Sequence, residues 1–398
     1  MHEADGSAGG ASDPVDLVVA VEHTDEVVRM LRDFEVGDAD VERSSALGLS
    51  LVRVPAADAA AARFSAEVAE QVGTRLAGSG HGEPTHLDRL LTGLRVGFAA
   101  TYNGWAPTMG KNRLLGGVVG GGKISHGGAL APAASDRQLA VREARPGRGV
   151  RVGVLDTAIR AHPWLAGGWV AAPGDVRPDG DAPAAAGHAT FVAGLVLQEA
   201  PGCVVAARQV LADDGSADSW SVAREIVAHG QDGLDVLNLS LFCHTEDGEA
   251  PLVLARAIDR LPSETVVVAA AGNYGKEGTL DGPDRPAWPA ALDGVIAVGA
   301  TDDAGKTAPF SPAGVPWVDA LAPGVNRVST YLDGTVTFDK GDPLRFEGLA
   351  SWSGTSFAAA SVSGAIAART VPGRVSARRA WEMMREESER PAVVRLRS

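Results

Sequence analysis

Five apolar segments recur between residue 149 and about residue 300 of the 398-residue chain, and helix-like patterns separate them. The segments read GVRVGVLDT, CVVAARQVL, LDVLNLSL, TVVVAAAGN and GVIAVGAT. Strands that are apolar on both faces belong to parallel sheets covered by helices on both sides, so the sequence predicts a doubly wound α/β domain. Ligands bind such sheets at the carboxyl ends of the strands, and candidate site residues are expected there.

The chain divides into regions of different composition. Residues 1–14, rich in Gly, Ser, Ala and Asp, are expected to be a disordered tail. Residues 15–75 alternate strand-like and helix-like patterns, which predicts a small α+β domain of ferredoxin-like type. Residues 76–148 are glycine-rich and are expected to connect it to the α/β domain, which should span 149–385. Residues 386–398 are expected to be a C-terminal tail.

Charge and cysteine content exclude several kinds of protein. The 50 acidic residues outnumber the 36 basic ones, and the net charge of -14 argues against a nucleic-acid partner. With two cysteines, Cys203 and Cys243, the chain cannot be a disulfide scaffold or bind metal through a thiolate cluster. The sequence shows no signal-peptide pattern and no apolar run of about 18 residues, so we expect a cytoplasmic protein without membrane contact.

A glycine-rich motif raises the alternative of nucleotide binding. Gly117 to Lys123 reads G-x-x-x-x-G-K, the spacing of a phosphate-binding loop. Such a loop needs a hydroxyl after the lysine to hold magnesium, and Ile124 stands there. We therefore expect a chance match.

Asp156 and His188 are the first two candidates for chemistry. Asp156 ends the first apolar segment, where it can belong to a functional site at the carboxyl edge of the sheet or cap the next helix. His188 leads the apolar helix pattern HATFVAG, and its small neighbours leave the imidazole approachable. A histidine in such a place is often structural, but it can act as a general base if another group orients it.

Ser356 and Asn273 are the other two candidates. Ser356 lies in SGTSFAAASVSG, at the start of a helix pattern of small residues. A helix N-terminus favours developing negative charge, so Ser356 can be a nucleophile whose own N–H stabilises an oxyanion, or simply a cap. Asn273 follows the run VVVAAAG, where it can serve as a turn residue or donate its amide to an oxyanion.

In chain order, these residues and their surroundings resemble the subtilisin-like serine peptidases, the subtilases. The shared blocks follow the family order over about residues 149 to 370: VGVLDT, GHATFVAG, VLADDGSADSW, VLNLSL, VVVAAAGN, WPAALDGVIAVGAT, LAPG and SGTSFAAASVSG. The order Asp, His, Ser differs from that of α/β-hydrolase esterases, in which the serine comes first and the histidine last. The resemblance implies a doubly wound sheet of the subtilisin type.

The resemblance also implies a role for each candidate. Asp156 would orient the imidazole, His188 would act as general base and then acid, and Ser356 would be the acylating nucleophile. Asn273 and the Ser356 N–H would form the oxyanion hole. The resemblance also places the primary side chain of the substrate in a pocket with two walls and a floor. The first wall, which would also pair with the substrate backbone, is Ser240, Leu241 and Phe242. The second wall is Ala270, Ala271 and Gly272, and the floor is Ala287. Pro289 matches a position that is cis-proline in the family.

Five residues depart from the family pattern. Phe242 stands in place of a glycine, so its ring either narrows the pocket or swings out toward another subsite. Ala158 and Ala189 each replace a glycine and add one methyl group near the site. Ala360 and Ser361 replace a proline and a histidine behind the nucleophile. All four polar candidates are retained.

Taken together, the sequence predicts a serine endopeptidase acting on peptides or unfolded protein segments. The alternative is a silent subtilase fold that binds peptides or serves as a scaffold. The chemistry requires no cofactor, and no short pattern identifies a calcium site. Since subtilases are commonly made with an N-terminal prodomain, the region 15–75 is expected to resemble one and to act as an inhibitor. Self-cleavage is then expected between about residues 125 and 148.

Overall fold

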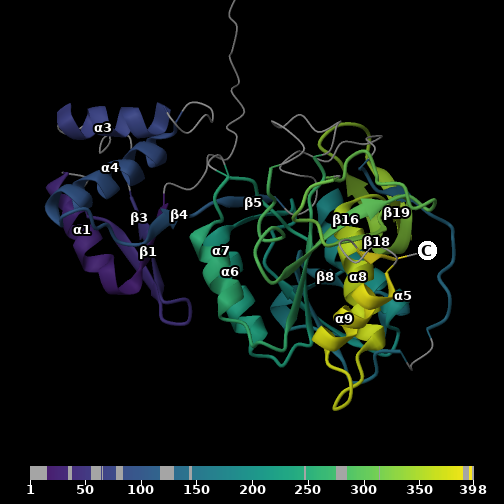
Figure 1. Cartoon of the computed structure of the whole chain (residues 1–398). Coiled ribbons are helices and arrows are strands. Elements are labelled where there is room, and N and C mark those ends of the chain that lie inside the picture. Colours follow the sequence, from purple (N-terminus) through teal and green to yellow (C-terminus); the bar gives the residue numbers. More distant parts are fainter. Residues whose placement is uncertain are drawn as a thin grey trace, which may run out of the picture. The chain divides into compact units, whose positions relative to one another are not determined.

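The computed structural model describes residues 16–34, 38–54, 64, 66–77, 84–116, 130–142, 146–245, 248–274, 285–312, 314–388 and 394–396. The chain forms two compact units, the first made of Met1–Leu114 with Pro251–Val253 and the second of the remaining residues (Figure 1). The expected tail at 1–14 and the motif Gly117 to Lys123 lie outside the described residues.

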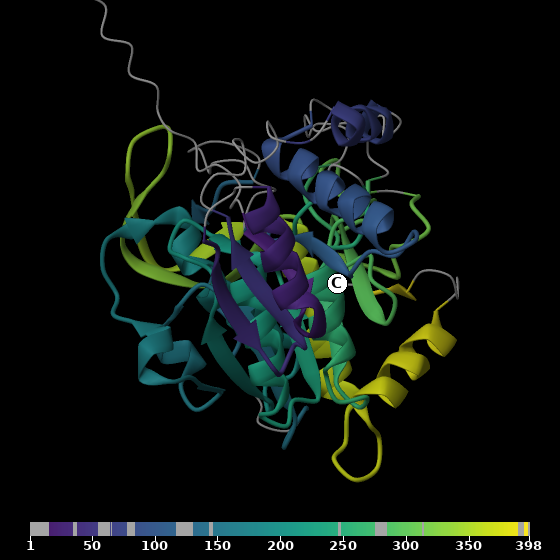
Figure 2. The same ribbon diagram turned by 90° about the vertical axis from the view of Figure 1, so that its left-hand side faces the viewer.

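The first unit is an antiparallel sheet packed against helices. Its strand order is β2-β3-β1-β4, and every pair is antiparallel. The elements are β1 (Asp16–Ala20), α1 (Thr24–Asp33), β2 (Asp40–Ser44), β3 (Leu49–Arg53), α3 (Ala66–Ala77), α4 (His86–Thr101) and β4 (Met109–Lys111). Helix α1 crosses the sheet in Figure 2, and its buried Val27 and Leu31 join Leu17 and Val19 of β1 in the core. Apart from the additional helix α3 before α4, this is the β-α-β-β-α-β arrangement of a ferredoxin-like fold.

This unit continues well past residue 75, where the sequence pattern placed its end. Leu87, Leu90, Leu91 and Leu94 put an apolar stripe on α4, and Thr85 and Asp88 form a capping box at its start. Helix α4 and the edge strand β4 therefore belong to the sheet's own fold, although both fall in the region expected to be a connector.

The second unit contains a parallel sheet of eight strands in the order β20-β17-β16-β15-β14-β7-β12-β9. Neighbouring strands of this sheet pair in parallel. The strands are β7 (Arg151–Asp156), β9 (Trp169–Val170), β12 (Val204–Gln209), β14 (Val236–Leu239), β15 (Val266–Ala270), β16 (Val295–Thr301), β17 (Ala320–Pro323) and β20 (Val394–Arg395). The five apolar segments are β7, β12, β14, β15 and β16, which confirms the doubly wound α/β prediction. Strand β20, from the expected C-terminal tail, pairs with β17 at the sheet edge.

Helices lie on both sides of this sheet. In Figure 1, α6 (Ser219–Gly230) and α7 (Leu252–Asp259) are on one side, and α5 (His188–Glu199) and α8 (Thr355–Arg369) are on the other, with α9 (Ala377–Glu387) beside α8. Every residue of α8 from Thr355 to Ala367 is buried, because its small side chains let the helix pack closely on β14 to β17. No helix in the described part of the chain is long and apolar enough to span a bilayer.

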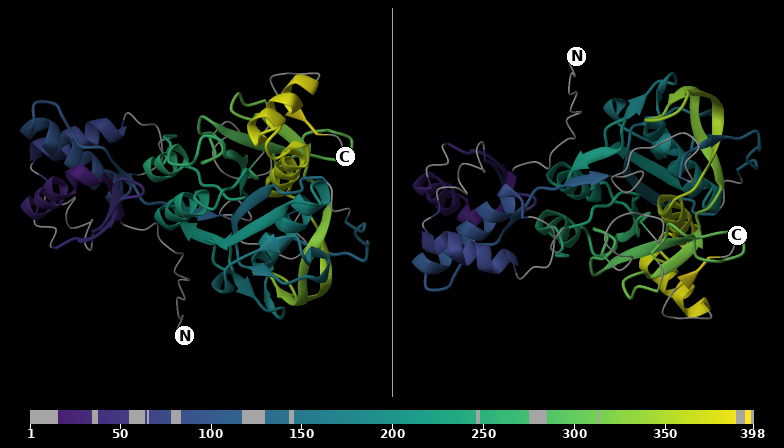
Figure 3. Two further views of the ribbon diagram at one scale, coloured as in Figure 1. Left: turned by 90° about the horizontal axis from the view of Figure 1, so that it is seen from below. Right: turned by 90° about the horizontal axis from the view of Figure 1, so that it is seen from above.

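A second sheet supports the start of α5. It has the order β11-β18-β19-β6, in which β11 (Ala182–Pro183) and β6 (Ala133–Ala134) are short. The long hairpin of β18 (Arg327–Thr337) and β19 (Leu344–Trp352) lies at the edge of the unit in Figure 3. Ser329 and Thr330 of β18 donate side-chain hydrogen bonds to the carbonyls of Phe191 and Thr190, at 2.8 and 2.7 Å. Strand β19 then leads directly into α8. The hairpin thus connects the helices that carry His188 and Ser356.

The chain order of the strands locates the site. Strand β12 follows β7 in the chain but lies on one side of it, whereas β14 lies on the other. The sheet therefore changes its winding direction at β7. Ligands of such sheets bind beyond the carboxyl ends of the strands at this point.

Candidate active site

Asp156 and His188 form a buried pair at the carboxyl end of β7. Asp156 is the last residue of β7, His188 is the first residue of α5, and both are fully buried. His188 Nδ1 lies 2.8 Å from each oxygen of the Asp156 carboxylate. Because a carboxylate can only accept, Nδ1 carries the hydrogen and Nε2 presents its lone pair. Nε2 is buried and has no hydrogen-bond partner among the described residues.

Local contacts hold this pair in place. The N–H of Thr157 donates to Asp156 Oδ1 at 2.7 Å, and the Thr157 hydroxyl accepts from the N–H of Ala189 at 3.1 Å. The turn after β7 is thereby bonded to the first turn of α5. The His188 ring also packs edge-on to Trp352, with centroids 5.6 Å apart, and against Phe357 at 5.5 Å. These contacts fix the imidazole's orientation.

Ser356 is the second residue of α8, where the backbone N–H has no partner within the helix. Its Oγ donates to the Ser240 carbonyl at 3.3 Å, and Ser240 Oγ donates to the Ser356 carbonyl at 3.0 Å. Ser356 Oγ is not hydrogen-bonded to His188 Nε2 in this structure. Such bonds often form only when substrate is bound.

The two amide atoms of Asn273 have opposite surroundings. Its Oδ1 accepts hydrogen bonds from the N–H and the hydroxyl of Thr355, at 2.9 and 3.0 Å. Its Nδ2 is buried without a partner in the part of the chain that the structure describes. A Cβ atom added to Gly354 would lie 3.6 Å from Nδ2, so this donor faces the N-terminus of α8. The arrangement leaves a fixed, unused donor beside Ser356.

Two supporting residues were not recognised in the sequence. The Thr355 hydroxyl accepts from the N–H of Gly272 at 3.1 Å as well as donating to Asn273, so it connects the end of β15 to α8. Asn238 of β14 donates to Ser240 Oγ at 2.9 Å and accepts from Ser363 Oγ at 3.0 Å. The signal for Asn238 was a polar residue inside the apolar run VLNLSL, whereas Thr355 resembles an ordinary first-turn residue.

The structure brings the expected substrate-binding residues together. Strands β14 and β15 pair in parallel register, with Leu239 opposite Ala269, so the segments that follow them leave the sheet side by side. Those segments carry the first and second walls, and Ala287 lies against Phe242 in a small buried cluster with Tyr274. The residues of the walls and floor are all buried: Ser240, Leu241, Phe242, Ala270, Ala271, Gly272 and Ala287. The Trp288-Pro289 peptide bond is cis, as the resemblance implied.

A segment of the chain itself pairs with the first wall. Gly116 and Phe242 form an antiparallel bridge, in which the Gly116 N–H donates at 3.1 Å and the Phe242 N–H donates at 3.4 Å. Gly116 ends β5 (Leu114–Gly116), which also pairs with β13 (Ser216–Asp218). Leu115 is buried in this position. The wall therefore accepts an extended strand through its backbone.

The other departures from the family pattern are accommodated. Ala158 and Ala189 are buried beside the pair, and neither displaces the Asp156 carboxylate from His188. Ala360 and Ser361 are buried in α8, and Ser361 Oγ has no hydrogen-bond partner within the described ranges. No group of three or more His, Cys, Asp or Glu side chains among the described residues could hold a metal ion.

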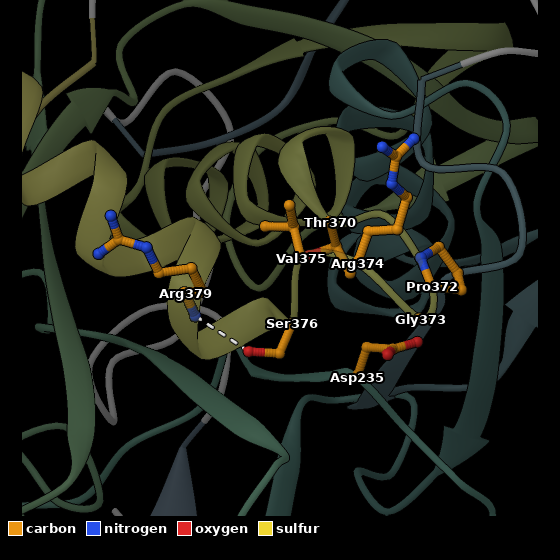
Figure 4. A pocket seen from close by; sticks show the side chains of 8 residues that line it. All are labelled: Asp235, Thr370, Pro372, Gly373, Arg374, Val375, Ser376 and Arg379. Carbon is orange, nitrogen blue, oxygen red and sulfur yellow. Dashed lines mark hydrogen bonds between the residues drawn. The ribbon is translucent and has the colours of Figure 1, made fainter.

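A hollow of about 410 Å³ lies elsewhere, around the end of α8 and the start of α9. Figure 4 shows its lining, from Asp235, Thr370, Pro372, Gly373, Arg374, Val375, Ser376 and Arg379. Asp235 precedes β14, so the hollow is at the amino end of that strand. It is therefore separate from the site at the carboxyl ends.

The buried Asp156–His188 pair, the serine at a helix N-terminus and the free amide donor together define the site of a serine hydrolase. Residues 147–382, more than half of the chain, match the sequence model of the Subtilase family. The chain belongs to the subtilases, and it is a serine endopeptidase.

Known proteins show the extent of the similarity. Subtilisin Savinase of Lederbergia lenta is 37% identical over 250 residues, which cover 60% of this chain and 80% of that protein. The Alkaline protease of Alkalihalobacillus alcalophilus is 37% identical over 250 residues, covering 60% of this chain and 56% of its own length. A solved structure of a mutant of the protease domain of PatA has a TM-score of 0.50 and 26% identity, covering 64% of this chain and 94% of that one.

Proposed function

We propose that this subtilase cleaves peptide bonds through an acyl-enzyme on Ser356. The observation that carries the proposal is a pair of buried polar atoms near this serine, His188 Nε2 and Asn273 Nδ2, neither of which has a hydrogen-bond partner in the described part of the chain. Asn273 accepts a hydrogen bond from Thr355, which precedes Ser356, and the His188 ring packs against Phe357, which follows it. Leaving a buried polar atom unpaired costs about 1–3 kcal/mol, so two such atoms at one serine suggest that a reacting group pairs with them.

In the proposed reaction, Ser356 Oγ attacks the carbonyl carbon of the peptide while its proton passes to His188 Nε2. The developing oxyanion accepts hydrogen bonds from Asn273 Nδ2 and the Ser356 N–H. The C–N bond then breaks, and His188 returns the proton to the leaving amine. Water, deprotonated by His188, attacks the ester and restores the Ser356 hydroxyl. Asp156 holds the Nδ1–H tautomer and stabilises the imidazolium. None of these steps needs a cofactor.

The proposed substrates are peptides and unfolded protein segments. A peptide can bind as an added antiparallel strand along the backbone of Phe242, as Gly116 does in this structure. Folded proteins seldom present such an edge, so extended segments are favoured.

We also propose that the chain cleaves itself between about residues 125 and 148, with its N-terminal region as an inhibitor before cleavage. This range falls partly outside the described residues. The antiparallel bridge between Gly116 and Phe242 supports the proposal, because a segment that precedes this range in the chain pairs with the wall expected to bind substrate.

Two experiments test these proposals. A fluorophosphonate probe should label the wild-type protein but not Ser356→Ala, and only the wild type should hydrolyse casein. An unlabelled, inactive wild type would favour the alternative of a peptide-binding scaffold. N-terminal sequencing of the active form tests the self-cleavage, and an active enzyme that remains one uncut chain would contradict it.

A further inference from the structure

Two aromatic rings pack against the second wall of the expected pocket, at Gly272. Phe242 is 2% exposed and Tyr274 is 4% exposed, and both pack with Ala287 in one buried cluster. A Cβ atom added to Gly272 would lie 2.4 Å from Tyr274 Cε1 and 3.3 Å from Phe242 Cε2. The rings of Phe242 and Tyr274 therefore lie directly against Gly272 of the second wall.

The Phe242 ring is held inward. The backbone of Cys243 exchanges two hydrogen bonds of 2.9 Å with that of Trp288, which joins the first wall to the segment that carries Ala287. Phe242 itself is bridged to Gly116 on its other side. With its neighbours fixed in this way, the buried ring does not swing out toward another subsite. The structure thus distinguishes between the two orientations that the sequence left open.

Hydrogen bonds and a ring contact hold Tyr274 and His244 next to the Phe242 ring. The Tyr274 hydroxyl donates to the Arg285 carbonyl at 2.7 Å, and the His244 ring meets Tyr274 edge-on, with centroids 4.2 Å apart. His244 Nδ1 lies 3.1 Å from the Pro286 carbonyl, to which it donates. Burial lowers the pKa of His244, so its ring is uncharged at neutral pH. The rings form a rigid, uncharged filling.

The position of this filling determines which substrate side chain it meets. A peptide bound along Phe242 presents to Ser356 the carbonyl of the residue opposite Ser240. The side chain of that residue, called P1 here, has to fit between the extensions of β14 and β15. A large P1 side chain would need the volume that Phe242 and Tyr274 occupy. The side chains of Gly, Ala and Val would need the least of this volume.

We infer that Phe242 and Tyr274 restrict this peptidase to substrates with a small P1 residue. The inference rests on the proposed function, since it concerns the acyl side of the same reaction. The rings act by excluding large side chains and take no part in bond breaking.

The test uses a series of coumarin amides, Leu-Gly-Gly-Xaa, in which Xaa is Gly, Ala, Val, Leu or Phe. With the full-length protein, or the form that it produces by self-cleavage, we expect kcat/KM for Ala or Val to exceed that for Phe at least tenfold. Phe242→Gly should raise the ratio of kcat/KM for the Phe substrate to kcat/KM for the Ala substrate at least tenfold. Phe242→Leu should have an intermediate effect and should disturb folding less.

Phe346→Leu provides a matched control, because it shortens a fully buried ring that packs on Tyr331 in the second sheet. Its P1 profile should equal that of the wild type. A wild-type preference for Phe or Leu would overturn the inference even if no Phe242 variant folds. An unchanged profile in folded Phe242→Leu would overturn it too. If a fluorophosphonate labels the wild type but the wild type prefers a large P1 residue, only this inference is contradicted. If the fluorophosphonate does not label the wild type, the proposed function is contradicted.

Discussion

Asn273 offers the sharpest separation of catalysis from stability. Asn273→Ala removes the acceptor of two hydrogen bonds from Thr355, but it also removes the buried Nδ2 that has no partner among the described residues. Each unpaired buried group costs about 1–3 kcal/mol, so the loss of two bonds and the relief of one unpaired donor partly offset each other. We expect the free energy of unfolding to change by no more than about 2 kcal/mol, and Tm to change by a few degrees.

The effect on turnover should be much larger. Removing one oxyanion donor typically lowers kcat by about a hundredfold to a thousandfold, or about 2.7–4 kcal/mol of transition-state stabilisation. Because Nδ2 acts on the transition state and not on bound substrate, KM should stay within about twofold. Steady-state kinetics with a peptide amide and a thermal melt of the same preparation provide both numbers.

Thr355→Val is the matched variant. It keeps the shape of the side chain and the Thr355 N–H bond to Asn273, but it loses the hydroxyl that connects Gly272 to Asn273. We expect kcat to fall about tenfold, less than in Asn273→Ala, because the amide keeps one of its two anchors. A kcat reduced less than tenfold in Asn273→Ala, or a change in KM alone, would refute the assignment of Nδ2 as the oxyanion donor.

Three further predictions follow from the described contacts. Asp156→Asn should lower kcat by about 10⁴-fold by favouring the wrong imidazole tautomer, with little change in KM, as measured by steady-state kinetics with a peptide amide. Burial raises the pKa of the Cys203 thiol to about 12, so the native protein should leave Cys203 unmodified by iodoacetamide at pH 8, while denatured protein should be alkylated there. Burial also raises the pKa of Asp319, whose carboxylate accepts from the Ala297 N–H at 2.9 Å. A raised pKa in the folded state means that ionisation costs stability above the unfolded pKa, so Asp319→Asn should raise Tm at pH 7 and much less at pH 4, and an equal effect at both pH values would contradict this.

The sequence predicted the sheet and the positions of the candidate residues at its edge, because both depend on local patterns. Apolar runs such as VGVLD and VVVAA can only be buried strands, and Asp156 and Asn273 stand at or just beyond the ends of two of them. The helix at Ser356 was visible in its small residues. These features required no knowledge of which strands are neighbours.

Other features depended on contacts between distant segments. The three-residue strand β4 contains a glycine and shows no alternation, so its pairing with β1 could not be predicted, and the first unit was expected to end too early. The short strand β20 lies in a charged C-terminal region, and its pairing with the distant strand β17 could not be predicted from its own sequence either. Thr355 and Asn238 gained their importance only from hydrogen bonds to Asn273 and Ser240. The direction of the Phe242 ring was set by packing against Tyr274 and Ala287.

The acyl-enzyme itself provides the most direct test of the central claim. Protein mixed with the p-nitrophenyl ester of a short peptide, quenched in acid within its first turnovers and digested, should carry the peptidyl group on the fragment that contains Ser356. The account predicts this mass addition on Ser356 in wild type and its absence in Ser356→Ala. An active wild-type enzyme that shows no acyl adduct, or carries it on another residue, would contradict the account.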